Sequence, residues 1–126
     1  MSSDVRNDLK YTDDHEWLKV ENKNAKVGIT DHAQSELTDI VFVELPEIGK
    51  TVKKGDELCV VESVKSVSEI YAPVSGKVVN VNKKLEDEPE QINSSPYDEG
   101  WLVEIEMENK SEIDELLDAD SYKKLI

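Results

Sequence analysis

The sequence predicts a mainly β protein in which short antiparallel strands form a sandwich or a barrel, with helices confined to two places. Three observations predict this fold. Short segments alternate between apolar and polar residues or are β-branched, turn signals separate them, and apolar residues recur at helical spacing only after residues 31 and 111. We expect one domain over residues 1–126, with residues 1–8 as a flexible N-terminal extension.

The strand signal lies in short segments along the chain. They cover residues 16–20, 26–29, 40–45, 57–61, 77–81 and 101–107. Turn signals rich in glycine, proline and aspartate separate them, at residues 46–49, 54–56, 73–76 and 89–100. The chain also contains the pattern P-x-x-G-K-x-V twice, at residues 46–52 and 73–79, which suggests two similar half-units.

The first helix is predicted near residues 31–38. Asp31 and Gln34 resemble a capping box, a pair that satisfies backbone N–H groups at a helix start. Ala33, Leu37 and Ile40 then recur at helical spacing.

Further helices are predicted near residues 111–126. Ser111 precedes Ile113, Leu116 and Leu117, which are spaced as on a helix, and Asp120 is a candidate cap for a final short turn. The region is acidic first and basic last, as a helix dipole favours.

Charge and composition limit the classes of partner. Lys and Arg number 15 and Asp and Glu number 29, so the net charge is −14. Such acidity opposes binding to nucleic acid or anionic membrane lipid and favours docking on basic protein surfaces. The alternative is that the charge only keeps the protein soluble. The single Cys59 cannot form an intramolecular disulfide, and no apolar run is long enough to span a membrane. We therefore expect a soluble, cytoplasmic monomer.

The string ESVKSVSE, centred on Lys65, reads almost the same in both directions. The strand pattern around it is longer than a usual strand, so it is expected to fold back as a hairpin in its polar middle. A tip at Lys65-Ser66 would place Glu62 opposite Glu69, which is mildly unfavourable. A tip at Val64-Lys65, in a type I turn, is the alternative. Both registers put Lys65 in the exposed turn.

Lys65 is the candidate for the chemistry of the protein. It is the only cation between Lys54 and Lys77, and its small or β-branched neighbours leave the amine reachable by another protein's active site. A Schiff-base lysine needs an apolar pocket, and a serine-rich tip is the wrong place for one. An exposed lysine on a stiff tip suits covalent attachment of a group carrier such as biotin or lipoate.

The segment ESVKSVSEIYAPVSGKVVNVN resembles the lipoyl-attachment segment of the glycine cleavage system H protein family. The resemblance continues through YTDDHEW, VGITDHAQSELTDIVFVELPEIG, NSSPYDEGW and LLDADSYKKLI, from about Leu9 to the C-terminus. It implies a hybrid barrel-sandwich of the biotinyl/lipoyl-carrier type with lipoate attached covalently to Lys65. Biotin domains usually flank the lysine with methionine, which this segment lacks.

The resemblance implies a carrier and not an enzyme. In that family, lipoyl-lysine accepts an aminomethyl group from the pyridoxal-phosphate glycine decarboxylase and carries it to the tetrahydrofolate-dependent aminomethyltransferase. Dihydrolipoamide dehydrogenase then reoxidises the arm, and a lipoate ligase or lipoyl transferase attaches it in the first place. The alternative is a lipoate-relay protein that supplies lipoyl groups to other apo-domains.

Two further sets of residues follow from the resemblance. Glu62, Ser68 and Glu69 match the attachment pattern and are expected to guide the lipoylating enzyme. A groove is expected to shelter the loaded arm, with an anionic end for its ammonium at Glu16 and Glu69. Its apolar floor is predicted on the first helix, from residues spaced four and four: Ile29, Ala33 and Leu37.

The remaining conspicuous residues are assigned to packing. His15 and His32 lack a third ligand at metal spacing, so capping or packing roles are expected and no metal site is predicted. Trp17 and Trp101 are expected in the core.

Overall fold

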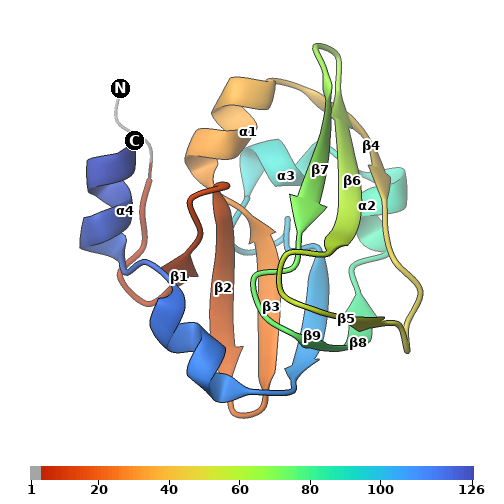
Figure 1. The fold of residues 1–126 in the computed structure, drawn as a ribbon. Helices are drawn as coiled ribbons and strands as arrows, with labels where there is room; N and C mark the ends of the chain where they lie inside the picture. Colours follow the sequence, from red (N-terminus) through yellow and green to blue (C-terminus); the bar gives the residue numbers. More distant parts are fainter. Residues whose placement is uncertain (1–3) are drawn as a thin grey trace.

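The computed structural model describes residues 4–126, which form two antiparallel sheets with helices beside them (Figure 1). The six-stranded sheet has the order β1-β2-β3-β9-β8-β5, and the three-stranded sheet the order β4-β6-β7. The predicted mainly β fold of antiparallel strands is confirmed. The strands are β1 Lys10–Tyr11, β2 Glu16–Glu21, β3 Asn24–Ile29, β4 Ile40–Glu44, β5 Thr51–Val52, β6 Glu57–Ser63, β7 Val67–Tyr71, β8 Gly76–Val81 and β9 Val103–Met107.

The two sheets share one hydrophobic core. Val27 of β3, Val61 of β6 and Ile105 of β9 are fully buried in the same cluster. Because alternate residues of each strand point to opposite faces, each sheet gives one face to this core, and the other face of the larger sheet carries Tyr11 and Trp17 of a second buried cluster.

The shortest elements were not predicted. Strands β1 and β5 have two residues each, too few for an alternating pattern to show. Helices α2 (Lys84–Asp87) and α3 (Gln91–Ser94) have four residues each. Helix α2 precedes the stretch 89–100 that was predicted as turn, and α3 lies within it. The turn prediction is therefore wrong for residues 91–94, because a single helical turn carries the same polar and proline-flanked signal as a loop.

Helix α1 (Asp31–Leu37) lies where a helix was predicted, but its cap differs. Thr30 is the N-cap, and its hydroxyl accepts a hydrogen bond of 3.2 Å from the Ala33 N–H. Asp31 is already helical, and its carboxylate accepts from the Gln34 side chain at 2.8 Å. The predicted capping box was therefore misplaced, because the extended Thr30 presents its hydroxyl to the helix first.

The first C-terminal helix is a short 3-10 helix, η1 (Lys110–Glu115). Asn109 caps it by accepting from the Ser111 N–H at 3.0 Å, so the helix starts earlier than predicted. Leu117 lies beyond it in extended chain and exchanges two backbone hydrogen bonds of 2.8 Å with Tyr11. This pairing with β1 satisfies the backbone groups that a continuous helix would have used.

The last helix, α4 (Ala119–Leu125), is capped by Asp118, whose carboxylate accepts from the Ser121 N–H at 2.8 Å. Asp120, the predicted cap, lies inside the helix. Both predicted helical regions are thus present, with N-cap residues that differ from the predicted ones.

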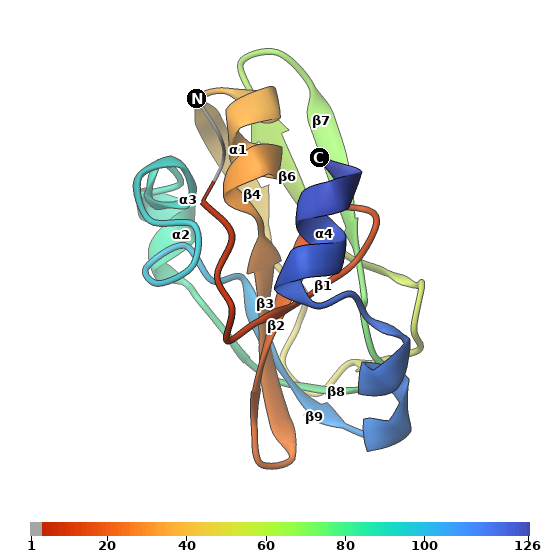
Figure 2. The ribbon, with the colours of Figure 1, turned by 90° about the vertical axis from the view of Figure 1, so that its left-hand side faces the viewer.

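Tyr122 holds α4 against the body of the protein. Its ring stacks on Tyr11 of β1 with centroids 4.6 Å apart, and its hydroxyl is 2.7 Å from Thr30 Oγ1. Figure 2 accordingly shows α4 beside α1 and β1. Trp17, only 1% exposed, belongs to the same aromatic cluster, which confirms the core role predicted for it, whereas Trp101 is half-buried and packs against the cluster.

Residues 4–8 make specific contacts with the domain instead of extending away from it. The Tyr97 hydroxyl donates to the Asp4 carbonyl at 2.5 Å, the Arg6 guanidinium lies 3.1 Å from the Asp98 carboxylate, and the Tyr11 hydroxyl donates to the Arg6 carbonyl at 2.7 Å. Residues 4–8 of the flexible extension expected over residues 1–8 thus pack on the domain, and residues 1–3 lie outside the described part of the chain. Across residues 4–126, we find no helix with the length and apolarity needed to cross a membrane.

Candidate functional site

The candidate site begins at the tip of the β6–β7 hairpin, which lies at the top of the molecule in Figure 1. Lys65 is exposed in this turn. Glu62 pairs with Val67 and Glu69 pairs with Val60. The tip thus lies one residue earlier than in the register that would set the two glutamates opposite each other. That register is wrong and the alternative is confirmed, because each glutamate then faces a valine and not a like charge.

The hydroxyl of Ser63 fixes the backbone of this turn. It accepts from the N–H groups of Lys65 and Ser66 at 3.1 and 3.0 Å and donates to the Ser66 carbonyl at 3.2 Å. Ser63 was not among the predicted site residues, although a serine at the first position of a turn is a recognised signal. The backbone that presents Lys65 is therefore held by a side chain that does not use the lysine amine.

The tip also contacts the end of helix α1. The Lys65 ammonium donates to the Glu36 carbonyl at 3.2 Å, and the Val64 N–H donates to the Asp39 carbonyl at 3.0 Å. Helix α1 has no basic residue in its last turn, so Lys65 provides a positive charge at the negative end of the helix.

The residues predicted to guide a lipoylating enzyme flank the tip on both strands. Glu62 is half-buried and Glu69 exposed, and both project from the outer face of the three-stranded sheet. Ser68, half-buried, pairs with the fully buried Val61 and so faces the other way. The structure therefore presents the two carboxylates, and not the serine, on one surface with the tip.

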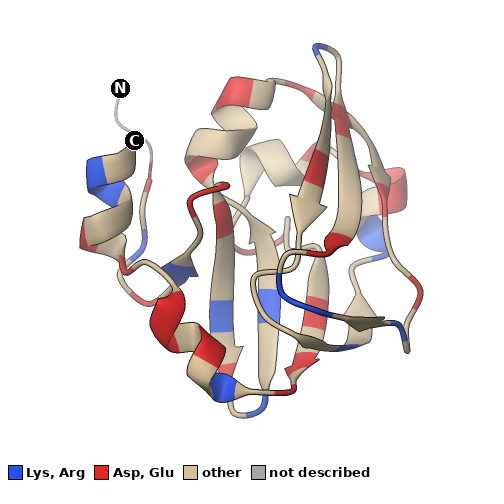
Figure 3. Cartoon of the chain, in the orientation of Figure 1, with Lys and Arg blue, Asp and Glu red and all other residues tan. Residues whose placement is uncertain are grey.

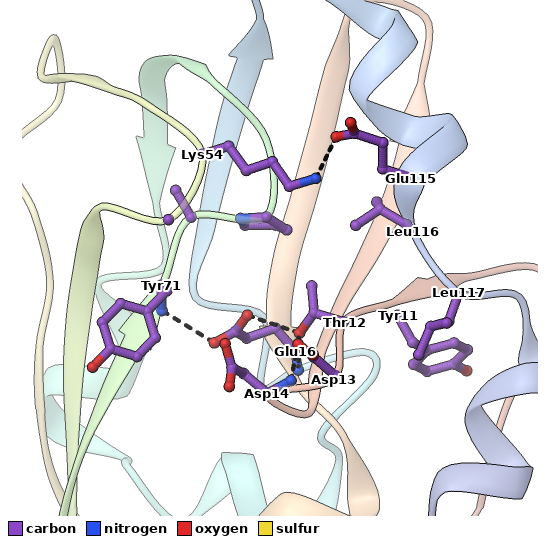
Figure 4. Close-up of a pocket in the computed structure, with 13 residues that line it drawn as sticks. Tyr11, Thr12, Asp13, Asp14, Glu16, Lys54, Tyr71, Glu115, Leu116 and Leu117 are labelled. Carbon is purple, nitrogen blue, oxygen red and sulfur yellow. Dashed lines mark hydrogen bonds and ion pairs between the residues drawn. The ribbon is translucent and has the colours of Figure 1, made fainter.

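A cleft of about 320 Å³ lies at the opposite end of β7 (Figure 4). Tyr71 lines one side and the end of η1 lines the other, with Glu16 between them at the bottom of the view. From Val67 to Tyr71 is roughly 14 Å of strand, so the tip and the cleft are joined by a single strand. The charged residues that line the cleft are four acids, Asp13, Asp14, Glu16 and Glu115, and one base, Lys54.

Glu16 is the most unusual residue of the cleft, because its side chain carries a carboxylate and is only 2% exposed. It accepts hydrogen bonds from the Thr12 hydroxyl at 2.9 Å and from the Tyr71 N–H at 3.1 Å. Burial raises the pKa of Glu16 to about 7, against the opposing effect of these two hydrogen bonds. The group therefore changes its charge near neutral pH.

Glu16 and Glu69, the predicted anionic end of a groove, are linked through one residue but do not share the cleft. The Tyr71 hydroxyl donates to Glu69 at 2.9 Å, and the Tyr71 backbone donates to Glu16. Glu69 is exposed and is not among the lining residues.

The three residues of the predicted apolar floor do not form one helix face. Ile29 is the last residue of β3 and not part of a helix, and at 2% exposure it belongs to the core. Ala33 and Leu37 are half-buried on α1 and pack against the same core. None of the three lines the cleft, because the strand that carries Ile29 places it inward before the helix starts. The apolar wall of the cleft instead consists of Ala72, Pro73, Leu116 and Leu117.

The two histidines pack against each other, and His15 also packs against Tyr122 of α4. Their ring centroids are 4.9 Å apart, and His15 Nδ1 lies 2.8 Å from the Tyr122 hydroxyl. Burial and the neighbouring His32 lower the pKa of His15. Within residues 4–126, no cluster of His, Cys, Asp and Glu side chains has the geometry to hold a metal ion.

Comparisons with known proteins give one consistent family. The family model described as glycine cleavage H-protein matches residues 9–126. The glycine cleavage system H protein of Halalkalibacterium halodurans is 55% identical over 124 residues, which are 98% of this chain and 97% of that protein. The protein of the same name from Staphylococcus haemolyticus is also 55% identical, over 97% of each chain.

A solved structure supports the same relationship. The crystal structure of a glycine cleavage system H protein from Mycobacterium marinum superimposes with a TM-score of 0.88 and 40% sequence identity. The match covers 95% of this chain and 97% of that one, so the fold is shared over nearly its full length.

Proposed function

Because this chain belongs to the glycine cleavage H-protein family, we propose that it is the lipoyl carrier of a glycine cleavage system, with the lipoyl group on Lys65. The position of Lys65 carries this assignment. It lies exposed at the tip of a hairpin whose turn backbone Ser63 holds in place. The proposed partners are the glycine decarboxylase that loads the carrier, the aminomethyltransferase that unloads it, dihydrolipoamide dehydrogenase and a lipoate ligase or lipoyl transferase.

The surroundings of Lys65 fit covalent attachment through an amide. Within residues 4–126, no salt bridge includes Lys65, and its ammonium is held by one hydrogen bond to the Glu36 carbonyl. The Nζ atom must lose a proton to solvent and use its lone pair to attack an activated carboxyl carbon, so that the amide C–N bond forms as the bond to the activating group breaks and that group leaves. Because the contact that it gives up is exposed, this costs the fold little.

A carrier needs a reactive group on a stiff mount. When attached, the lipoyl group supplies a disulfide that is reduced as it takes up the aminomethyl group and is later reoxidised. The protein contributes the mount: the strands β6 and β7 and the Ser63 hydrogen bonds keep Lys65 at a fixed point. A tether on a fixed point gives a docked partner a high effective concentration of the group.

The cleft is our candidate for sheltering the aminomethyl cargo between partners. Glu16 would hold its ammonium in the cleft, and Glu69, linked through Tyr71, would guide it along β7. A nearby ammonium favours the ionised form of Glu16, so the raised pKa would fall when cargo is present. The apolar residues that close this cleft, and not the predicted floor on α1, would contact the rest of the arm.

The proposed function is tested by glycine–bicarbonate exchange with purified glycine decarboxylase. Lipoylated wild-type protein should support exchange, and Lys65→Arg should support none, because arginine keeps the charge but offers no acylatable amine. Lys23→Arg is the matched control, since Lys23 is also exposed in a hairpin turn, between β2 and β3. Exchange by lipoyl protein separates a glycine carrier from a lipoate relay, and exchange by Lys65→Arg would exclude Lys65 as the site. The cytoplasmic location and monomeric state stay predictions.

A further inference from the structure

The outer face of the three-stranded sheet carries exposed apolar residues next to acidic ones. The registers of β4, β6 and β7 set these residues in two cross-strand rows. The row nearest the tip reads Phe42, Glu62 and Val67, and the next reads Glu44, Val60 and Glu69. Because paired residues on neighbouring strands point to the same face, apolar and acidic side chains alternate across one continuous surface.

The apolar residues of this face are unusually exposed. Phe42 is 50% exposed and Val67 62% exposed. Val41, beside the bulge in β4, is 50% exposed, and Val64 at the tip is 69% exposed, so the apolar surface continues to the lysine. Single exposed apolar residues are common on proteins, but a group of four beside one functional residue indicates an interaction surface.

The other sheet shows what an ordinary solvated face looks like in this protein. Beyond Tyr11 and Trp17, which belong to the aromatic cluster beside α4, two rows of its outer face are polar and carry both signs of charge, with Lys26 opposite Glu104 and Lys77 opposite Glu106. One row reads Lys19, Lys26, Glu104 and Asn80, and the next reads Glu21, Asn24, Glu106, Lys77 and Thr51. Solubility alone therefore does not require the single sign of charge or the exposed apolar residues of the smaller sheet.

The charge of the face decides what can cover it. Its paired positions within residues 4–126 include no lysine or arginine, and Figure 3 shows acidic segments on these strands with a basic one at the hairpin tip. A second copy of the chain would bring glutamates against glutamates, and an anionic lipid surface would be repelled in the same way. A protein surface with arginine or lysine side chains around an apolar depression is complementary in both respects.

We propose that this face, formed by Phe42, Val60 and Val67 with Glu44, Glu62 and Glu69, is the surface on which the glycine decarboxylase docks. This inference rests on the proposed function, because it takes the enzyme that loads the arm as the partner. The face lies directly below Lys65, so an enzyme bound to it has the attached group at its own surface. The enzyme should then also bind the unlipoylated protein, because docking on this face does not use the lipoyl arm.

The test uses unlipoylated protein as a competitor of lipoylated wild-type protein in the exchange reaction. The inhibition constant then reports docking alone, since the competitor has no arm. Phe42→Ser should raise this constant about tenfold, the size of effect that a central interface contact produces. Val20→Ser is the matched control, because Val20 is 38% exposed on the other sheet, and it should leave the constant unchanged.

A second pair of variants tests the charge of the face. Glu44→Lys should raise the inhibition constant, most strongly at low salt, whereas Glu21→Lys changes the net charge equally on the other sheet and should have little effect. Equal effects of both variants, or an unchanged constant for both Phe42→Ser and Glu44→Lys, would overturn the docking surface.

The remaining outcomes separate the two proposals. If unlipoylated wild-type protein does not inhibit the exchange reaction while lipoylated protein supports it, the docking face alone is overturned. Lipoylated wild-type protein that supports no exchange overturns the proposed function. Sedimentation that shows a dimer dissociated by Phe42→Ser would identify a second copy as the occupant and overturn the choice of partner.

Discussion

Because Glu16 is a buried carboxylate, we predict that it makes the free energy of unfolding depend on pH, and that Glu16→Gln removes this contribution. Its pKa is raised from 4.5 to about 7 by burial, so the native protein binds this proton more tightly than the unfolded chain does. The contribution of Glu16 to stability is therefore full below pH 4.5 and is lost as the pH rises through about 7. In glutamine the side chain is neutral at every pH, while its oxygen can still accept from the Tyr71 N–H.

The magnitude follows from the size of the shift. At high pH, the ionised Glu16 lowers the free energy of unfolding by about 3 kcal/mol relative to low pH, since one pKa unit corresponds to about 1.4 kcal/mol. Between pH 5.5 and pH 8, a range that avoids precipitation near the pI of 4.4, about 2 kcal/mol of this cost develops. Relative to wild type, Glu16→Gln should thus gain about 2 kcal/mol of unfolding free energy between these two pH values.

Urea denaturation at both pH values measures this difference. Other titrating groups are shared by the two proteins and cancel in the comparison. Glu21→Gln on the same strand is the control, because Glu21 is exposed and its substitution should give no such change. If the free-energy difference between Glu16→Gln and wild type stays constant within about 0.5 kcal/mol, well under the expected change, the buried carboxylate does not titrate as described.

Three further outcomes are expected. Ser63→Ala should destabilise the protein by about 1 kcal/mol in urea denaturation and slow lipoylation of Lys65, whereas Ser66→Ala, whose hydroxyl makes no hydrogen bond within residues 4–126, should do neither. Glu16→Gln in the loaded protein should release the aminomethyl group faster without aminomethyltransferase, with unchanged lipoylation; equal rates would remove Glu16 from the shelter. Binding of the decarboxylase should weaken as salt rises, mainly through slower association, and binding indifferent to salt would show that the charge of −14 serves solubility alone.

The sequence patterns predicted the longer strands and the hairpin, because strands of five or more residues such as β6 show alternation and the polar middle of ESVKSVSE marks a turn. They did not predict β1 or β5, whose two residues pair only because other strands are already in place. The cap of α1 was misplaced by one residue because Thr30 and Asp31 are both good capping residues, and only the backbone conformation distinguishes them.

The site was predictable to different degrees. Lys65 stands out from local sequence, because its exposure depends on its own turn. The setting of Glu16 does not, since its partner Tyr71 and the wall at Leu116 come from two segments that are distant in the sequence. Ile29 was predicted on a helix face because spacing alone does not show where the strand ends. The docking face also needed the observed registers, since a shift by one residue would turn Phe42 and Glu44 inward.

Attachment of lipoate to Lys65 is tested most directly by tryptic mass mapping of the protein isolated from its native host. Trypsin cuts after lysine, and an acylated lysine is not cut. A lipoylated Lys65 should therefore appear inside an uncut peptide of residues 55–77 that is heavier by one lipoyl group. The account predicts this peptide, with the added mass localised to Lys65 by fragmentation. Complete cleavage after Lys65, or a lipoyl group found on another lysine, would contradict it.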